Sequence, residues 1–393
     1  MKRLRYPPAF AGAVEAVASS AGQLTPPVMG AGAFIMAEFL NIPYTQIAVA
    51  AIGPAFLYYL AIWLGVDLYA RRTGLQPTPR SEMPQPSDFL APDKAIPLFL
   101  PIATVIYFLF QGYTPSFAGA ASIIVLILSC AVVRPFAQAG RGQGLRACWI
   151  GLARDVYEGM VEAGRALVMI AALLACAAIV VKVLTATGAG VKISNLLFSV
   201  SDQGLIVALL LAAVLSIVLG MDVPTTASYV LAAAVAAPSL VRLGLPELTA
   251  HLFVFYYAIL SAITPPVCAS VYAAAALAGA NFWKVAGRAL VLAGAVYVVP
   301  FLFVFRPGIL AQGGTGQVIL DLGVASAAVF AVSVGLSGYL RGTLPLGTRA
   351  LFLATAALLF YAAPAADIVG GLALVGLVVW RYLRGERKVL SDG

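Results

Sequence analysis

The tetrapeptides Thr25-Pro26-Pro27-Val28 and Thr264-Pro265-Pro266-Val267 are identical, and each lies in the middle of a long apolar segment. Two adjacent prolines remove two backbone donors and clash with the preceding turn, so a continuous helix cannot pass through either site. In lipid such a break is tolerated only where the freed backbone is buried in protein or lines a polar cavity. Two matched breaks in one chain therefore predict a secondary transporter built from repeats, with its binding site near the membrane midplane.

The composition places the chain in a membrane. Hydrophobic residues make up 62% of it and charged residues only 10%, whereas a soluble domain carries about 25% charged residues. The basic residues sit in short loops between apolar runs, which is the pattern of a multi-pass membrane protein and argues against nucleic-acid binding. It places the loops after 70 and 134 on the cytoplasmic side. These residues are Lys2, Arg3, Arg5, Arg71, Arg72, Arg134, Arg141, Arg146, Arg154, Arg381, Arg384, Arg387 and Lys388.

Apolar runs of spanning length predict an all-α polytopic membrane protein. No signal peptide is visible at the N-terminus. The expected spans are 44–70, 95–111, 115–134, 160–185, 203–219 and 284–305, with three more in the tail at 318–340, 349–363 and 367–383, and the broken segments are 8–40 and 246–280.

Three segments are not expected to span. Residues 72–93 form a Pro-rich polar loop. Residues 141–158 mix charged and apolar side chains, which predicts an amphipathic helix in the membrane interface. Residues 220–243 begin with a polar Gly- and Pro-containing break, followed by an apolar helix of about 12 residues that is too short to cross, which predicts a re-entrant hairpin.

The two breaks belong to a larger repeat. The offset of 239 residues that superposes Thr25 on Thr264 also superposes Arg3 on Arg242, Leu4 on Leu243 and Pro7 on Pro246. Each unit thus has a basic turn, a Pro at a helix start and a break. A hairpin directly precedes the second unit, so the equivalent hairpin of the first is expected just upstream of Met1, and the chain is expected to be a truncated or split form.

This organisation predicts five parts. They are 1–43, the broken helix of the first repeat; 44–219, the scaffold and connecting spans; 220–283, the second hairpin and second broken helix; 284–310, a closing span; and 311–393, extra C-terminal helices.

Several stretches of sequence resemble the large permease of tripartite ATP-independent periplasmic (TRAP) transporters. They are Tyr6–Ala16, Gly22–Ala31, Phe34–Leu40, Gly220–Tyr229, His251–Tyr257 and Ser261–Val267. The resemblance covers about 1–310 and is strongest to fused permeases that join the small and large subunits. The tail at 318–383 resembles the extra C-terminal helices of those fused forms.

The resemblance implies an elevator-type transporter with inverted repeats in a bacterial or archaeal cytoplasmic (inner) membrane. It implies coupling to sodium, with no other cofactor, and import of an organic acid that a TAXI-type periplasmic binding protein delivers. The chain departs from the family in lacking the small-subunit helices and the first hairpin, which a separate polypeptide is expected to supply. It also carries Asp222 where similar chains have a small or neutral residue.

The substrate and ion site is expected at the two breaks and the hairpin tip. An unwound helix offers backbone carbonyls to sodium, here near Gly22, Thr25, Ser261 and Thr264, and half-helix N-termini favour a carboxylate. The expected site residues are Ser19, Ser20, Gly22, Gln23, Thr25, Pro26, Pro27, Gly220, Met221, Asp222, Thr225, Thr226, Ser261, Ala262, Thr264, Pro265 and Pro266.

Some roles stay open at the level of sequence. Asp222 is either the N-cap of the hairpin helix or an ion ligand. Ser19 and Ser20 either line the site or bond back to helix carbonyls. Glu15 is the intramembrane carboxylate to watch. Each Pro pair has the plainer interpretation of a packing kink.

Two other functions compete with the permease. One is an elevator-type anion carrier that needs no binding protein, and the other is a fragment that transports nothing. An enzyme is not expected, because the spans hold no Ser/His pair, paired Asp or metal cluster, and no phosphate-binding Gly-x-x-x-x-Gly-Lys-Ser/Thr stretch exists.

Overall fold

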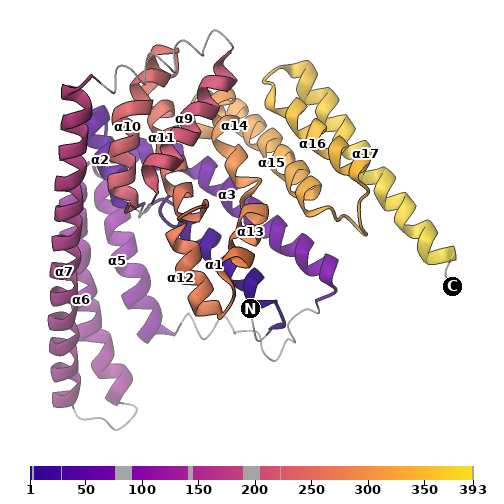
Figure 1. Cartoon of the computed structure of the whole chain (residues 1–393). Helices are drawn as coiled ribbons and strands as arrows, with labels where there is room; N and C mark the ends of the chain where they lie inside the picture. The colour runs from indigo at the N-terminus through magenta and orange to yellow at the C-terminus, as the bar shows by residue number, and fades with distance from the viewer. Residues whose placement is uncertain are drawn as a thin grey trace. The chain divides into compact units, whose positions relative to one another are not determined.

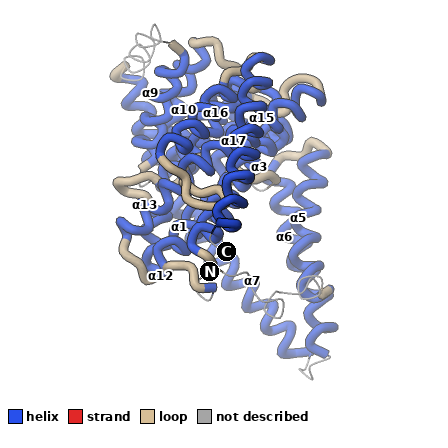
Figure 2. Tube along the Cα trace, turned by 90° about the vertical axis from the view of Figure 1, so that its right-hand side faces the viewer, coloured by secondary structure: helices blue, strands red, loops and turns tan. Residues whose placement is uncertain are grey.

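The computed structural model describes residues 1, 4–27, 29–75, 91–139, 145–188, 204–221 and 223–391. Within these ranges the chain is α-helical and forms no strand, apart from one isolated bridge between Tyr339 and Thr343 (Figure 2). The chain divides into two compact units. Unit 1 comprises Met1–Leu40, Ile47–Pro77 and Val180–Gly393, and unit 2 comprises Asn41–Gln46 and Thr78–Ile179.

Unit 1 holds both broken helices, as the Pro pairs predicted. In the first, α1 (Pro8–Ala21) ends before the Pro pair and α2 (Ala31–Leu40) begins after it. In the second, α11 (Glu247–Leu260) continues into the 3-10 turn η3 (Ser261–Ile263), and α12 (Ala269–Ala278) follows the break. Each first helix begins directly after a proline, because the missing N–H of proline would be unpaired at a helix start.

The hairpin of unit 1 is longer than expected. Its arms are α9 (Leu205–Gly220) and α10 (Thr225–Arg242), which pack against each other. The expectation of a separate span at 203–219 and a helix of about 12 residues is therefore wrong. The segment α9 is the first arm, and α10 has 18 residues because Pro238 does not end it.

The helix α3 (Tyr44–Thr73), from Ile47 onward, and the bent segment at 282–305 also belong to unit 1. The helix α3 has 30 residues and is uninterrupted, as expected for 44–70. The expected single span at 284–305 is bent by 51°, between α13 (Phe282–Ala293) and the segment formed by η4 (Val296–Val298) and α14 (Val299–Phe305). Tyr58 of α3 donates to the Val17 carbonyl of α1, and α9 packs on α11. The expected scaffold of 44–219 stays a prediction.

The three expected tail helices are present and also belong to unit 1. They are α15 (Thr315–Ser337), α16 (Leu346–Phe360) and α17 (Pro364–Ser391), preceded by the turn η5 (Pro307–Leu310) (Figure 1). A buried ion cluster joins them to α14. Arg306, Asp321 and Asp367 meet there although they come from three separate elements, and sequence analysis did not single out any of them.

Unit 2 contains a helical pair and a long helix. The helix α5 (Pro92–Phe110) packs on α6 (Pro115–Ala139), as expected for the spans 95–111 and 115–134. The interfacial helix at 141–158 and the span at 160–185 were expected to be separate, and that separation is wrong. Residues 145–186 form one continuous helix, α7 (Leu145–Ala186), and the pair Arg154–Glu158 stabilises the turns just before the expected boundary.

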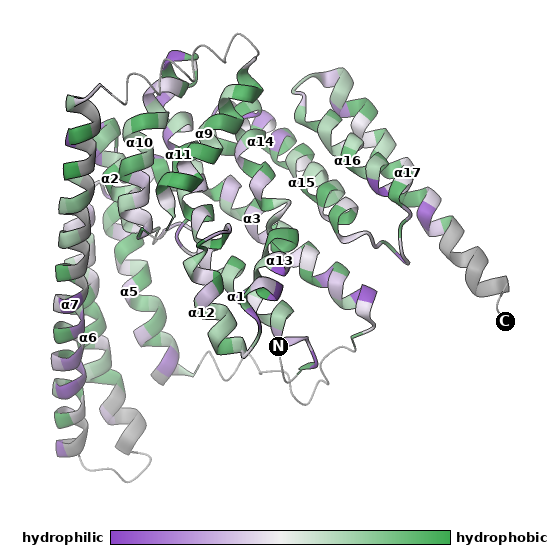
Figure 3. Cartoon of the chain, viewed as in Figure 1, coloured by the Kyte–Doolittle hydropathy of each residue, from purple (hydrophilic) through white to green (hydrophobic). Residues whose placement is uncertain are grey.

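Four described helices are long and apolar enough to cross a membrane, or five if the bent α13–α14 pair counts as one span. The four are α3, the 115–133 part of α6, α15 and the 364–383 part of α17. Hydrophilic residues gather in the N-terminal half of α7 and at helix ends (Figure 3). The polytopic α-helical fold predicted from the sequence is thereby confirmed. The expected loop at 72–93 lies largely outside the described residues.

Candidate functional site

At the first break, the chain closes a short loop on itself. The N–H of Gly30 donates to the Gln23 carbonyl at 2.9 Å, and the N–H of Thr25 donates to the Gly22 carbonyl at 3.3 Å. The Thr25 hydroxyl donates to the carbonyl of Ala21 at 2.7 Å and lies 3.2 Å from the hydroxyl of Tyr59 on α3. The peptide bond between Pro26 and Pro27 is cis.

The second break repeats these contacts. The N–H of Thr264 donates to the Ser261 carbonyl at 3.2 Å, and the Thr264 hydroxyl donates to the carbonyl of Leu260 at 2.6 Å. The same hydroxyl lies 2.6 Å from the Tyr297 hydroxyl in η4, and the peptide bond between Pro265 and Pro266 is cis. The two tetrapeptides thus share one local structure, a Thr held by the preceding helix and by a Tyr hydroxyl from a following one.

The two broken helices pack crosswise. In unit 1, α1 contacts α12 and α2 contacts α11 (Figure 1). If the two repeats ran parallel, the first halves would lie together and the second halves would lie together. Pairing of opposite halves is what a two-fold axis through the breaks produces, as in transporters with inverted repeats.

The hairpin tip is fixed to the second break. The Ser261 hydroxyl is 2.9 Å from the Gly220 carbonyl and 2.6 Å from that of Ala258, and the Ser228 hydroxyl of α10 also donates to Gly220 at 3.2 Å. A Cβ atom at residue 220 would lie 2.5 Å from the Ser261 oxygen, so only glycine permits this approach. The structure therefore brings two expected site residues, Gly220 and Ser261, into direct contact.

Two helices that start at the breaks have uncapped N-termini. The helix α10 begins at Thr225 and Thr226 after Pro224, and α12 begins after Cys268, with no side-chain cap on either from a described residue. The first N–H groups of such helices have no intrahelical acceptor and carry partial positive charge, which favours an anion. The position expected to cap α10 or bind an ion, Asp222, lies outside the described residues, as does Val28.

The side chain of Gln23 at the first break has a hydrogen-bond acceptor that no described residue uses. Its Oε1 atom is buried and has no hydrogen-bond partner among the described residues. A buried amide oxygen without a partner is costly, so such an atom in a native site calls for a ligand or an ordered water. Of the other expected residues, Met221, Ala262, Pro265 and Thr264 are partly buried, while Pro266 is exposed.

Ser19 and Ser20 bond within their own helix. The Ser20 hydroxyl donates to the carbonyl of Ala16 at 2.9 Å, and the Ser19 hydroxyl donates to Oε1 of Glu15 at 3.2 Å. The interpretation in which these serines bond back to helix carbonyls accounts for the contact of Ser20, whereas Ser19 bonds to a side chain. Glu15 is exposed on α1 rather than buried in a polar cluster.

Sequence analysis missed the two tyrosines of the site. Tyr59 follows Thr25 by 34 residues, and Tyr297 follows Thr264 by 33. Because the two separations differ by only one residue, extending the repeat alignment beyond the breaks could have identified both tyrosines. His251, the single histidine, pairs with the Tyr229 hydroxyl at 2.7 Å, and no cluster of three or more His, Cys, Asp or Glu residues that could hold a metal occurs among the described residues.

Comparison with protein families decides the class of protein. The family model of the tripartite ATP-independent periplasmic transporter, DctM component, matches residues 1–315. The chain belongs to this family. It is a TRAP transporter membrane permease, and the family implies a periplasmic binding protein as its partner and the lipid bilayer as its surroundings. A comparison with curated proteins returns no match.

The match ends where the tail begins. It covers both breaks, the hairpin and α13–α14, and stops at residue 315, the first residue of α15. The resemblance expected over about 1–310 is confirmed. The helices α15–α17 lie beyond the matched residues, apart from Thr315.

Proposed function

We propose that this TRAP permease imports an organic acid together with sodium, and that a periplasmic binding protein delivers the acid. The observation that carries the proposal is the shared local structure of the two breaks, the second of which contacts the hairpin tip within unit 1. Matched broken helices around a midplane site are the architecture of ion-coupled secondary transporters. In this proposal unit 1 carries the substrate and moves against a scaffold to which unit 2 contributes, as an elevator.

The oxygen atoms at the breaks suit sodium. A hard cation takes about six oxygen ligands, and carbonyl and hydroxyl oxygens serve without any carboxylate. The carbonyls of Gly22 and Ser261 each accept one described hydrogen bond at the break, and a carbonyl oxygen has two lone pairs. The Thr25 and Thr264 hydroxyls and the Gln23 amide oxygen add neutral ligands near them.

An anionic substrate follows from the charge of such a site. Residues 19–30 and 261–268, which form the two breaks, carry no Asp or Glu, and the one carboxylate of the hairpin tip is that of Asp222. A sodium ion bound at the breaks would therefore have no carboxylate partner from the breaks themselves. The uncapped N-termini of α10 and α12 add partial positive charge. A substrate carboxylate that binds beside the sodium ion balances both the charge of the ion and the partial charge of the helix N-termini. Substrate binding therefore depends on the ion.

Sodium binding is tested on the purified full chain by thermal unfolding in sodium chloride and in choline chloride. We expect sodium to raise the midpoint in wild type, and Thr264→Val to raise the half-saturating sodium concentration about tenfold, because one ligand oxygen is lost. Thr355→Val is the matched control, since the Thr355 hydroxyl bonds back to the Leu351 carbonyl within α16 at 2.8 Å. Equal responses to the two salts in wild type would contradict the proposal.

Transport is tested in proteoliposomes with a panel of labelled mono- and dicarboxylates. We expect uptake only when a sodium gradient and the periplasmic binding protein are both present. Uptake without the binding protein would favour a carrier of the other elevator-type class. An absence of uptake with every acid, alongside intact sodium binding, would point to a form that binds the ion but does not transport.

A further inference from the structure

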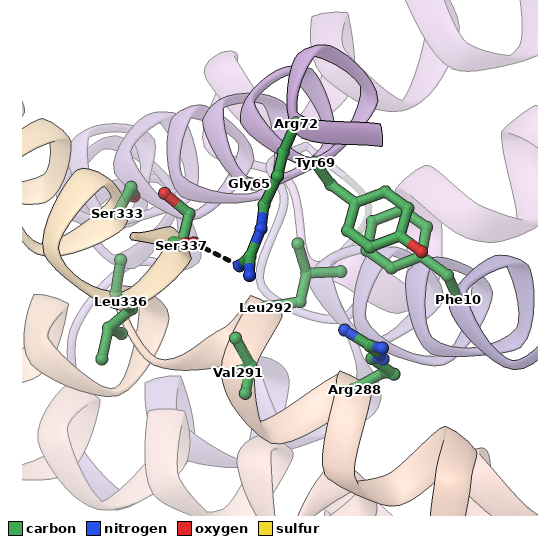
Figure 4. Close-up of a pocket in the computed structure, with 11 residues that line it drawn as sticks. Phe10, Gly65, Tyr69, Arg72, Arg288, Val291, Leu292, Ser333, Leu336 and Ser337 are labelled. Carbon is green, nitrogen blue, oxygen red and sulfur yellow. Dashed lines mark hydrogen bonds between the residues drawn. The ribbon is translucent and has the colours of Figure 1, made fainter. Parts of the chain in front are cut away.

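A small cavity lies between α3, α13 and α15 in unit 1, away from the breaks. Its volume is about 60 Å³, which exceeds the space of one water molecule. Its lining is mainly apolar and includes Phe10, Val291, Leu292 and Leu336, with Tyr69 stacked on Phe10 at a ring distance of 3.6 Å (Figure 4). The site can therefore take a small polar group attached to an apolar body.

Two arginines supply the polar part of the cavity. Arg72 extends from α3 and donates through Nη1 to the Ser337 carbonyl at 2.7 Å, and Arg288 lies over the ring of Tyr69 at 5.8 Å (Figure 4). Neither arginine forms a salt bridge within the part of the chain that the structure describes. Arg71, the neighbour of Arg72, is by contrast paired with Asp67 at 2.8 Å.

The cavity is also lined by a buried hydroxyl, that of Ser333, which lacks a hydrogen-bond partner among the described residues. Ser333 belongs to α15 and is 5% exposed. A hydroxyl can donate to an anion, and buried polar atoms are normally satisfied by protein, water or ligand. This is independent evidence, beyond the two positive charges, that the cavity takes an oxygen-rich anionic group.

The surroundings favour a lipid over a soluble anion. Along α13, beside the cavity, Trp283, Leu290 and Val291 are 66%, 38% and 54% exposed, and they form an apolar surface suited to acyl chains. Arg72 lies in the last turn of the spanning helix α3, beside the basic loop that the sequence predicts on the cytoplasmic side. Basic pockets between helices on that side of a membrane bind anionic headgroups.

We propose that the cavity formed by Arg72, Arg288 and Ser333 binds the phosphate of an anionic phospholipid, whose acyl chains lie along α13. The phosphate oxygens accept from both guanidinium groups and from the Ser333 hydroxyl. Because three lining residues, Ser333, Leu336 and Ser337, belong to α15, the bound lipid contacts both the residues that match the family and the C-terminal tail. The site is independent of the transport proposed above.

Native mass spectrometry of the full chain in detergent measures the binding of phosphatidylglycerol and of phosphatidylcholine. We expect wild type to prefer phosphatidylglycerol. Each of Arg72→Gln and Arg288→Gln should weaken that lipid about fivefold, and the pair about thirtyfold. Arg288→Gln is the decisive variant, since the Arg288 side chain is exposed and substitutions of exposed side chains change stability little. Arg71→Gln is the matched control and should leave the affinity unchanged.

Three results would overturn the proposal. Equal affinity for the two lipids would do so, as would an affinity for phosphatidylglycerol that Arg288→Gln leaves unaltered. Inorganic phosphate that displaces phosphatidylglycerol and stabilises the protein equally well would assign the cavity to a soluble anion.

The variants Arg72→Lys and Arg288→Lys keep the positive charge, and they should retain most of the preference for phosphatidylglycerol over phosphatidylcholine.

Discussion

We predict that the ion cluster of Arg306, Asp321 and Asp367 is the strongest single interaction between the C-terminal tail and α14. Arg306 is 1% exposed, and its guanidinium binds both oxygens of Asp367, Oδ1 of Asp321 at 3.4 Å, and the carbonyls of Leu359 and Tyr361 at 3.0 and 3.3 Å. Asp321, also 1% exposed, accepts in addition from the N–H of Gly308 at 3.0 Å. Arg306 and Asp321 are therefore paired away from water, while the side chain of Asp367 is 18% exposed.

Replacing Arg306 with Gln removes the only described cation from this cluster and leaves two acidic groups in it. Removal of one partner from a buried ion pair costs about 3–5 kcal/mol, because the remaining charge is neither solvated nor paired. The Asp321→Asn variant keeps one Arg306–Asp367 pair and the side-chain shape, so we expect a smaller loss of about 1–3 kcal/mol. The exposed pair of Arg71 and Asp67 provides the comparison, at about 0–1 kcal/mol for Arg71→Gln.

The free energy of unfolding is measured by titration with sodium dodecyl sulfate in mixed micelles, followed by circular dichroism. Limited proteolysis at the connection between α15 and α16 reports separately on whether the tail has come loose. Suppose Arg306→Gln lowers the free energy of unfolding no more than Arg71→Gln and leaves the α15–α16 connection protected from protease. The cluster then does not hold the tail in place, and the reasoning fails.

Three smaller predictions test the packing around the site. Gly220→Ala places a Cβ 2.5 Å from the Ser261 oxygen, so the tip must move and the half-saturating sodium concentration in the thermal assay should rise; an unchanged value would show that tip and break are not coupled. Tyr58→Phe removes a buried bond to the Val17 carbonyl of 3.0 Å and should cost about 1 kcal/mol in micelle unfolding. Arg154→Gln breaks an exposed pair on α7 and should change stability by less than about 0.5 kcal/mol.

The sequence alone predicted the helical fold and both breaks correctly, since these depend on local covalent geometry and on the length of apolar runs. Two adjacent prolines end a helix wherever they occur, and about 20 apolar residues span a bilayer in any context. Where local signals were weak, the prediction was wrong. No proline interrupts 145–186, so α7 continues through the expected boundary, and α9 is one arm of the hairpin rather than a separate span.

Only the tertiary structure decided which side chains meet. The Thr25 hydroxyl bonds to that of Tyr59, and the Thr264 hydroxyl bonds to that of Tyr297, each on another helix. The Ser261 hydroxyl donates to the Gly220 carbonyl, 41 residues earlier in the chain. The cluster around Arg306 joins residues 15 and 61 positions apart. In the sequence each of these charges lies near the end of an apolar run, where water is the default partner. Packing of α14 to α17 buries Arg306 and Asp321 and brings them together with Asp367 and with backbone groups of other elements, which no local pattern can reveal.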